Sequence, residues 1–293
     1  MRAKIGLVLG GGGSRGLAHI GVLDVLHREN IPIDFIVGTS MGAIIGVSYA
    51  NGMTPREIAQ DMTESGGTNI FNMNLFSAKA RQRDLQRKLE TTLSGKTFDD
   101  LNIKTALMTA DMLSGEEVVL QQGELIPAIL ASCAVPAVFP PVEIGDRQLA
   151  DGGVIDSLAT GTAFALGAER VIAVDVYPPL DSDDPWVDPV SSIVGVNLPF
   201  NILPISDWTK TPSMASSMWR AVRVMTWYLH EQRLKLHPPD VLLRPDVGDY
   251  GSLDFTDLEG PLAAGRLEAL RHIEKIKALT MPNHPATPAR MTS

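Results

Sequence analysis

The stretch Gly38-Thr39-Ser40-Met41-Gly42 constrains the fold of this chain more than any other. It follows the short apolar run 35–37 and precedes 43–50, a run of small and apolar residues with helical character. Ser40 therefore falls on a sharp strand-to-helix turn, in which flanking glycines avoid Cβ clashes. We interpret Ser40 as a candidate nucleophile, although a serine that only caps the following helix has the same pattern. The predicted elbow around it consists of Gly38, Thr39, Met41 and Gly42.

A glycine-rich loop near the start of the chain is the second constraint. The β-favouring run 4–9 leads into the four glycines 10–13, and apolar residues then recur at helical spacing from Leu17 to about Arg28. Glycines between a buried strand and a helix leave backbone N–H groups free to bind an anion where the helix dipole is positive. We expect this loop to donate hydrogen bonds to an oxyanion. The candidate donors are Gly11, Gly12, Gly13, Ser14, Arg15 and Gly16.

These two motifs are expected to be neighbours in space. The predicted strands 4–9 and 34–37 are joined by a single helical segment, which makes a strand-helix-strand unit with a right-handed crossover. The carboxyl ends of parallel strands meet at one edge of a sheet, where such folds bind their ligands. The sequence therefore predicts that Ser40 faces the glycine-rich loop.

The same glycine spacing also occurs in dinucleotide-binding proteins, which is the main rival hypothesis. That function requires an acidic residue at the carboxyl end of the second strand, whereas Asp34 lies at the beginning of that strand. A P-loop is excluded because no Gly-Lys-Ser/Thr follows. Two alternatives stay open: a nucleotide- or phosphate-binding regulatory protein that uses the Gly11–Gly16 loop, and a lipid-binding module without catalytic activity.

Composition narrows the class of protein further. The chain has 293 residues, is 44% hydrophobic and carries a net charge of -9, with a pI near 5.1. This acidic balance argues against a nucleic-acid partner, which needs a basic surface. The single cysteine, Cys133, lies in an apolar segment and is expected to be buried rather than catalytic. No run approaches the roughly 20 apolar residues that span a bilayer, so we expect a cytoplasmic protein.

The base that would activate Ser40 is less obvious. Asp151 follows a predicted strand and precedes Gly152 and Gly153, so a tight turn can present its carboxylate, although an ordinary β-turn aspartate has the same pattern. A serine-histidine-acid triad is the other arrangement. Four histidines are available for it by chain order, none of them in a glycine-rich or strand-end loop: His230, His237, His272 and His284.

The rest of the chain alternates helical and strand patterns. Helices are predicted over 54–62, 78–93, 125–133, 158–166, 213–236 and 261–279, and strands over 104–111, 117–121, 170–176 and 241–243. A loop is expected at 65–77 and an excursion over the sheet edge at 177–207. In helix 213–236 we expect an apolar stripe to dock on the core, with contact to a lipid surface as the less favoured role. The stripe consists of Met214, Met218, Val222, Met225 and Leu229.

Taken in order, three motifs resemble the signatures of the patatin-like phospholipase family: 11–16, 38–42 and 151–153. The segment 131–141 is similar to the proline-containing stretch before the acid in that family. The resemblance extends from Lys4 to Val176 and implies an α/β fold, a three-layer sandwich with a mainly parallel central sheet, related to the α/β-hydrolases. One departure is Asp156, at a position where bacterial relatives often carry asparagine.

The resemblance also implies an activity. It implies a serine acyl-hydrolase that cleaves fatty-acyl esters as a lipase, esterase or phospholipase A, with Ser40 as nucleophile, Asp151 as general base and the loop 11–16 as oxyanion hole. No metal or organic cofactor is required. Because the ordinary carboxyl pKa is about 4, a dry site must raise the pKa of Asp151 for it to act as a base near neutral pH.

The expected organisation is a catalytic core over 1–180, an extension over 181–280 that packs on the core, and a disordered tail over 281–293. The expected partners are an acyl-ester or phospholipid substrate and, at the periphery, a membrane surface.

Overall fold

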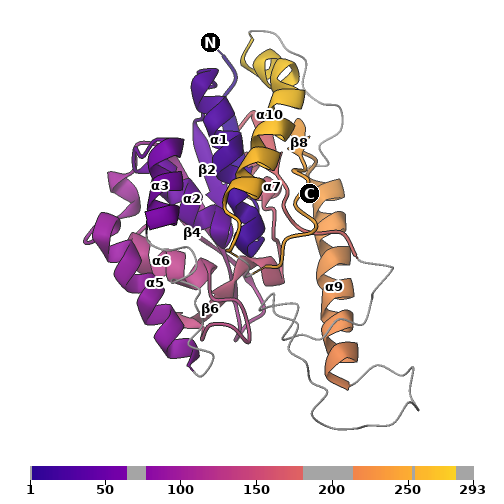
Figure 1. The fold of residues 1–293 in the computed structure, drawn as a ribbon. Helices are drawn as coiled ribbons and strands as arrows, with labels where there is room; N and C mark the ends of the chain where they lie inside the picture. The colour runs from indigo at the N-terminus through magenta and orange to yellow at the C-terminus, as the bar shows by residue number, and fades with distance from the viewer. Residues whose placement is uncertain (1, 65–76, 181–213, 253–254, 282–293) are drawn as a thin grey trace.

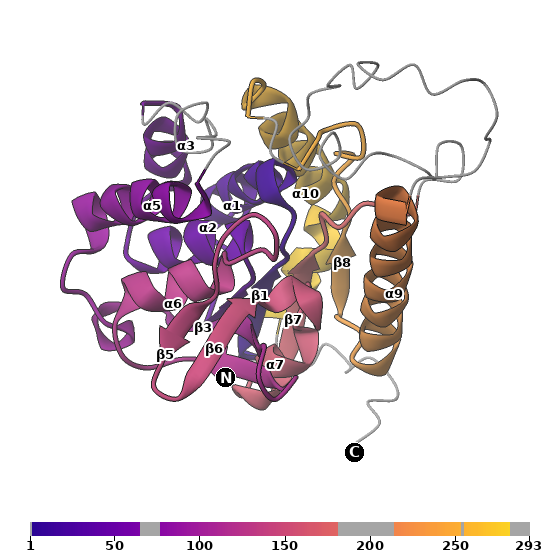
Figure 2. The ribbon, with the colours of Figure 1, turned by 90° about the horizontal axis from the view of Figure 1, so that it is seen from below.

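The protein is described by a computed structural model that covers residues 2–64, 77–180, 214–252 and 255–281. Within these ranges one mixed sheet of eight strands carries helices on both faces (Figures 1 and 2), which confirms the predicted α/β class with three layers. Three expectations lie largely outside the described residues: the loop at 65–77, most of the excursion at 177–207 and the C-terminal tail.

The sheet has the strand order β5-β6-β3-β2-β1-β7-β8, and β4 also pairs with β3. The pairs β1–β2, β2–β3, β1–β7 and β7–β8 are parallel, whereas β4 and β6 are antiparallel to β3 and β5 is antiparallel to β6. The strands are β1 Ile5–Leu9, β2 Phe35–Gly38, β3 Lys104–Asp111, β4 Glu117–Leu120, β5 Val142–Ile144, β6 Arg147–Asp151, β7 Arg170–Val174 and β8 Val241–Leu243.

Two apolar clusters lie on opposite faces of this sheet. Along β1 the side chains alternate, so Ile5 and Leu7 pack in the larger cluster with α1, α2 and α10, and Val8 packs in the smaller one with α7. The helices are α1 Ala18–Arg28, α2 Met41–Ala50, α3 Pro55–Glu64, α5 Ala78–Leu93, α6 Leu125–Ser132, α7 Thr160–Ala165, α9 Met214–Leu236 and α10 Glu259–Thr280. Short 3₁₀ helices are η1 Gly13–Leu17, η2 Phe98–Asp100 and η3 Gly152–Val154.

Strand β5 was not predicted, whereas the strand expected before Asp151 is present as β6. Strand β5 begins directly after Pro141, which ends the proline-containing stretch 131–141, and its three residues are partly or fully exposed. Such a short strand carries no alternation that a sequence pattern could detect, and proline is tolerated next to the start of an edge strand. The turn between the strands uses Gly145, which has a φ of 65°.

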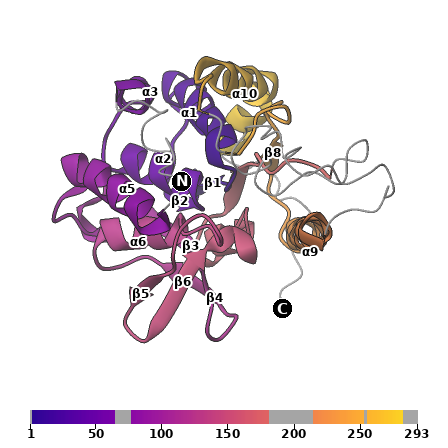
Figure 3. The same cartoon turned by 60° about the horizontal axis from the view of Figure 1, so that its bottom comes forward.

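Helix α9 lies beyond β8 at one side of the sheet (Figure 3) and does not dock its apolar stripe on the core, so that expectation was wrong. Met214 is 81% exposed and Met218 64% exposed. Polar residues at helical spacing make the contact face instead: Thr226 hydrogen-bonds Tyr177, and Arg233 pairs with Glu117. No helix among the described residues combines the length and the apolarity needed to cross a bilayer.

Helices α1 and α10 cross in close contact (Figure 1), because a glycine stands on each side of the crossing. A Cβ atom on Gly21 would lie 2.0 Å from the carbonyl oxygen of Leu262, and one on Gly265 would lie 2.0 Å from that of Ala18. The two backbones therefore touch, and α10 fixes α1 directly behind the glycine-rich loop.

Replacement of Gly265 tests this crossing. We expect Gly265→Ala to lower the free energy of unfolding by about 1–3 kcal/mol, because the added methyl group forces the two helices apart. Gly248→Ala is the matched control, since a Cβ at Gly248 meets no atom within 4 Å. Denaturant unfolding of both variants measures the effect, and equal stabilities would contradict the close crossing.

Candidate active site

Ser40 lies on the turn that connects β2 to α2, with a φ of 54° and a ψ of -120°. A Cβ on Gly38 would lie 2.6 Å from the Cα of Ala43, and one on Gly42 would lie 2.1 Å from the carbonyl oxygen of Leu9. Both glycines are therefore required by backbone contacts, as the elbow pattern predicted. The strained conformation points the Ser40 side chain into a cavity, although the residue as a whole is only 8% exposed.

The backbone of the elbow is held by buried groups. The Ser40 amide donates to the hydroxyl oxygen of Ser132 at 3.0 Å, and that hydroxyl donates to the carbonyl of Met108 at 2.8 Å. The Thr39 amide donates to the Leu9 carbonyl at 3.1 Å. Sequence reasoning missed the role of Ser132. A single polar residue at the end of the apolar helix α6 is the signal that indicates such a role.

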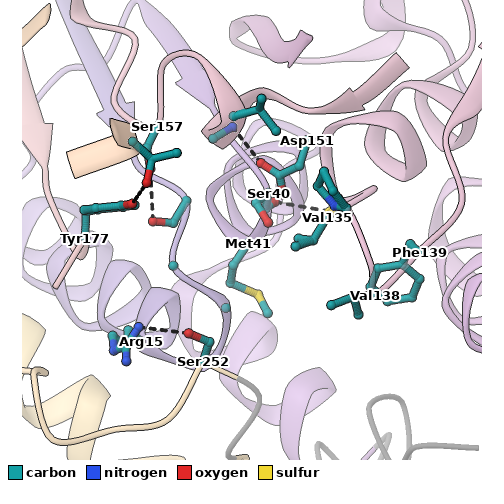
Figure 4. A pocket seen from close by; sticks show the side chains of 18 of the residues that line it. Arg15, Ser40, Met41, Val135, Val138, Phe139, Asp151, Ser157, Tyr177 and Ser252 are labelled. Atoms are coloured by element: carbon teal, nitrogen blue, oxygen red, sulfur yellow. Dashed lines mark hydrogen bonds between the residues drawn. The ribbon is translucent and has the colours of Figure 1, made fainter. Parts of the chain in front are cut away.

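Asp151 reaches the same sheet edge through the antiparallel strand β6. In β3, Leu107 is level with Gly38 of β2, and Thr109, two residues further on, is level with Asp151. Because Ser40 also lies two residues beyond Gly38, the serine and the aspartate stand at the same height along the sheet. The Ser40 side chain faces the Asp151 carboxylate across the end of β3 (Figure 4).

The environment of Asp151 changes its acidity. Burial raises the pKa of Asp151 from its ordinary value to about 6, and hydrogen bonds from the Ser40 hydroxyl and from the Gly153 amide oppose this rise. The Gly153 amide donates to Oδ1 at 2.7 Å and thereby orients the carboxyl group. Gly152 lies against the backbone of Met108, where a Cβ would approach to 2.7 Å. Asp151 can therefore gain or lose a proton close to neutral pH.

The glycine-rich loop lies against the elbow. A Cβ on Gly11 would lie 3.4 Å from that of Ser40, and one on Gly16 would lie 2.6 Å from the Met41 side chain. The loop amides are not equivalent, because Gly11 donates to the Ser157 carbonyl at 3.0 Å.

The amides of this loop differ in whether they already have a hydrogen-bond acceptor. The Ser14 amide donates to the Ser252 carbonyl at 2.9 Å. The Gly12 and Gly13 amides, by contrast, have no backbone acceptor among the described residues. Gly13 also needs the glycine backbone, since its φ is 59° and a Cβ there would lie 1.9 Å from the Ser252 carbonyl oxygen. Of the six predicted donors, Gly11 and Ser14 thus already have backbone acceptors, which leaves Gly12 and Gly13 as the amides able to bind a ligand.

A cavity of about 470 Å³ joins these groups. Its wall is mainly apolar and includes Met41, Val138 and Phe139, and Ser40 and Asp151 also line it (Figure 4). The volume falls in the range of small-molecule sites. The cavity can therefore take an extended apolar ligand and hold it beside the serine hydroxyl.

The histidines do not form a triad with Ser40 among the described residues. His230 hydrogen-bonds Asp175 at 3.1 Å, and His272 contacts the carbonyl of its own helix at Glu268. The ring of His237 packs against Gly161, and His284 lies outside the described residues. No histidine in the described part of the chain hydrogen-bonds Ser40 or Asp151, and the Ser40 hydroxyl hydrogen-bonds the Asp151 carboxylate instead.

Two further predictions concern Cys133 and Asp34. Cys133 is buried, its thiol donates to the Ser40 carbonyl at 3.4 Å, and burial together with the Asp151 charge raises the pKa of the thiol well above its ordinary value. Such a thiol is a poor nucleophile.

Asp34 accepts hydrogen bonds from Arg2 and from the Ile5 amide, at the opposite end of the strands from Ser40. It lies away from the glycine-rich loop, as the argument against dinucleotide binding required.

Asp156 contacts helix α9. Its carboxylate lies 3.6 Å from the Arg233 guanidinium, which also pairs with Glu117, and burial raises the pKa of Asp156 to about 6. It does not line the cavity.

Among the described residues, no group of three or more histidine, cysteine, aspartate or glutamate side chains is arranged to hold a metal ion.

Residues 7–226 match the family model of the patatin-like phospholipases. Lysophospholipase NTE1 of Pyricularia oryzae is 28% identical over 283 residues, which cover 94% of this chain and 19% of that protein. An uncharacterized NTE family protein of Mycobacterium bovis is 29% identical, over 91% of this chain and 46% of its own length. The chain thus spans less than half the length of these curated relatives. Among solved structures, VipD from Legionella pneumophila has the same fold, with a TM-score of 0.51 at 12% identity, over 94% of this chain and 67% of VipD.

Removal of the Ser132 hydroxyl tests how the elbow is held. We expect Ser132→Ala to lower the free energy of unfolding by about 1–3 kcal/mol, because the buried Ser40 amide loses its acceptor. Ser48→Ala is the control, since the Ser48 hydroxyl donates only to the Ile44 carbonyl of its own helix. Urea unfolding compares the two variants. A Ser132→Ala protein as stable as the control would show that the elbow does not depend on this hydrogen bond.

Proposed function

The chain belongs to the patatin-like phospholipase family, and we propose that it is a serine acyl-hydrolase that cleaves fatty-acyl esters, as a lipase, an esterase or a phospholipase A. The observation that carries the proposal is the contact between the Ser40 hydroxyl and the buried Asp151 carboxylate. The apolar cavity next to this pair supports an acyl substrate. The fungal relative's name, lysophospholipase, supports a lipid ester.

In the first half of the reaction, Asp151 accepts the hydroxyl proton of Ser40 while the serine oxygen bonds to the carbonyl carbon of the ester. The carbonyl oxygen becomes an oxyanion, which accepts hydrogen bonds from the Gly12 and Gly13 amides. The bond to the alcohol then breaks, and Asp151 gives the proton to the departing oxygen. The product of this half is an acyl-enzyme on Ser40.

In the second half, water replaces the alcohol. Asp151 accepts a proton from the water molecule as its oxygen attacks the acyl-enzyme, and the same loop amides bind the second oxyanion. Asp151 then returns the proton to the Ser40 oxygen as the fatty acid leaves. No step of this sequence needs a metal ion or an organic cofactor.

The electrostatics of the site suit this use of a carboxylate. A base works best when its pKa lies near the working pH, and the pKa of Asp151 is raised to about 6 by burial. The hydrogen bond from Gly153 keeps one carboxyl oxygen fixed at 2.7 Å, so the other can face the serine. Each amide that binds the oxyanion contributes about 3 kcal/mol to transition-state stabilisation.

Covalent labelling tests the nucleophile. We expect a fluorophosphonate probe to label the wild-type protein and not Ser40→Ala, and we expect this variant to lose hydrolysis of p-nitrophenyl butyrate by at least about 1000-fold, since the acyl-enzyme cannot form. Ser157→Ala, at a cavity residue that is not assigned to the dyad, is the labelling control. Wild-type turnover by Ser40→Ala would refute the assignment.

The pH dependence of the reaction tests the base. Asp151 is protonated below its pKa and ionised above it, so kcat/KM is expected to rise with pH, to reach half its maximum near pH 6 and to fall about tenfold per pH unit below that. The matched control is Asp156→Asn, because the pKa of this second buried aspartate is also raised to about 6. The acid limb should persist in the control, and its disappearance there would assign it to Asp156 instead.

A further inference from the structure

His19 is a buried histidine that the proposed reaction does not use. It lies in the first turn of α1, directly after the glycine-rich loop, and it is fully buried. Its Nε2 atom lies 2.7 Å from the carbonyl oxygen of Gly10, the first of the four glycines. A Cβ on Gly16, at the other end of the loop, would lie 3.5 Å from the Cδ2 atom of the same ring. The imidazole ring therefore lies against both ends of the loop.

The hydrogen bond with Gly10 determines which ring nitrogen carries the proton. A carbonyl oxygen only accepts hydrogen bonds, so Nε2 must be protonated and donate to it. Burial lowers the pKa of His19 to about 4, although the Gly10 hydrogen bond and the charge of Asp175 oppose this change. The ring is therefore neutral at neutral pH. Because a neutral imidazole has a single N–H group, Nδ1 is left as an acceptor.

The Nδ1 atom of His19 is buried and has no hydrogen-bond partner among the described residues. Such an atom lowers the stability of the fold, because it has given up its hydrogen bonds to water. Most buried polar side-chain atoms are paired, so an exception requires an explanation. An apolar ring would fill the same space without an unpaired nitrogen, but it could not donate to Gly10. The Nε2 donor, rather than packing, is thus the property that histidine contributes here.

The peptide unit between Gly10 and Gly11 is held at both of its polar groups. Its carbonyl accepts from His19, and its N–H group donates to the Ser157 carbonyl at 3.0 Å. The two groups point in opposite directions from one planar trans peptide. Neither glycine has a Cβ atom that would restrict the rotation of this plane. The two hydrogen bonds therefore set the orientation from which the rest of the loop continues.

The next two amides of the loop are those assigned to the oxyanion. Gly12 and Gly13 line the cavity, whereas Gly10 and His19 do not. The position of a hydrogen-bond donor relative to the developing charge decides how well it stabilises the transition state. Resting on the proposed function, we propose that His19 is a positioning residue: its Nε2–H group holds the Gly10 carbonyl and thereby keeps the Gly12 and Gly13 amides directed at the oxyanion.

Two amide side chains isolate the Nε2 donor. In His19→Gln the side-chain nitrogen is as many bonds from Cα as Nε2 is, whereas in His19→Asn it corresponds to Nδ1 and cannot reach Gly10. With p-nitrophenyl butyrate, we expect His19→Asn to lower kcat roughly 10- to 100-fold and to leave KM within about threefold of the wild type, because the donors act mainly on the transition state. His19→Gln should recover most of this loss. A kcat of His19→Asn equal to that of the wild type would overturn the proposal.

The matched control is His27→Asn. His27 lies on the same helix, is exposed and does not line the cavity, so its replacement should leave kcat unchanged. Thermal melting of each variant shows whether the fold is retained. If His19→Asn does not fold, His19→Gln decides: a folded His19→Gln protein whose kcat is lowered about 100-fold would show that a donor at this position is not sufficient, and would overturn the proposal.

An inhibitor that mimics the tetrahedral intermediate separates positioning of the loop from damage to the cavity. A trifluoromethyl ketone with a short alkyl chain forms an oxyanion adduct with a serine, and it should bind roughly 10- to 100-fold more weakly to His19→Asn than to the wild type. Hexanol, which has no carbonyl group, should inhibit both proteins equally. If the two inhibitors lose affinity to the same extent, His19 only maintains the cavity and the proposal is overturned.

Nuclear magnetic resonance tests the contact without relying on activity. In the wild type at neutral pH, the nitrogen-15 spectrum of His19 should show the proton on Nε2, and a proton on Nδ1 instead would overturn the proposal. The backbone amide resonances of Gly12 and Gly13 should move in His19→Asn and stay near their wild-type positions in His19→Gln. If the wild type hydrolyses no ester, the proposed function fails, and these spectra still decide whether His19 orients the loop.

Discussion

The contact between the beginning of α2 and the end of β1 is the constraint on which the site depends. The Leu9 carbonyl accepts a hydrogen bond from the Thr39 amide at 3.1 Å and lies so close to Gly42 that no side chain fits there. Gly16 packs on the Met41 side chain, so the glycine-rich loop and the elbow touch at a second point as well. At Gly42 the two segments touch through backbone atoms, so this part of their separation depends little on side-chain rotamers.

The parts of the site that depend on local signals could be predicted from the sequence. A buried strand that ends in glycines and is followed by a helix occurs twice within the first 50 residues, and the short connection between the two units makes the strands parallel neighbours. That argument alone brings Ser40 to the loop 11–16. The bounds of β3, α5 and β8 also followed from their apolar patterns, because these elements are long or sharply bounded by polar residues.

The parts that depend on pairing between distant segments could not be predicted. The height of Asp151 along the sheet is set by the antiparallel register of β6 against β3, and no local pattern records that register. Ser132 reaches the Ser40 amide from a helix whose position depends on the whole core. The stripe of α9 shows a further limit: an amphipathic pattern specifies an apolar face but not whether the core covers it, and here Met218 is exposed.

The C-terminal helix completes a loop that stands at the beginning of the chain. The family match ends at residue 226, yet the Ser14 hydroxyl donates to the Gly251 carbonyl at 2.6 Å and α10 packs on both η1 and α1. During synthesis the ribosome releases β1 and β2 first. The partners of the glycine-rich loop, Gly251, Ser252 and α10, are made much later. The newly made protein therefore completes the contacts of its glycine-rich loop only after residues 251 and 252 have been made, well after Ser40 and its strand have left the ribosome.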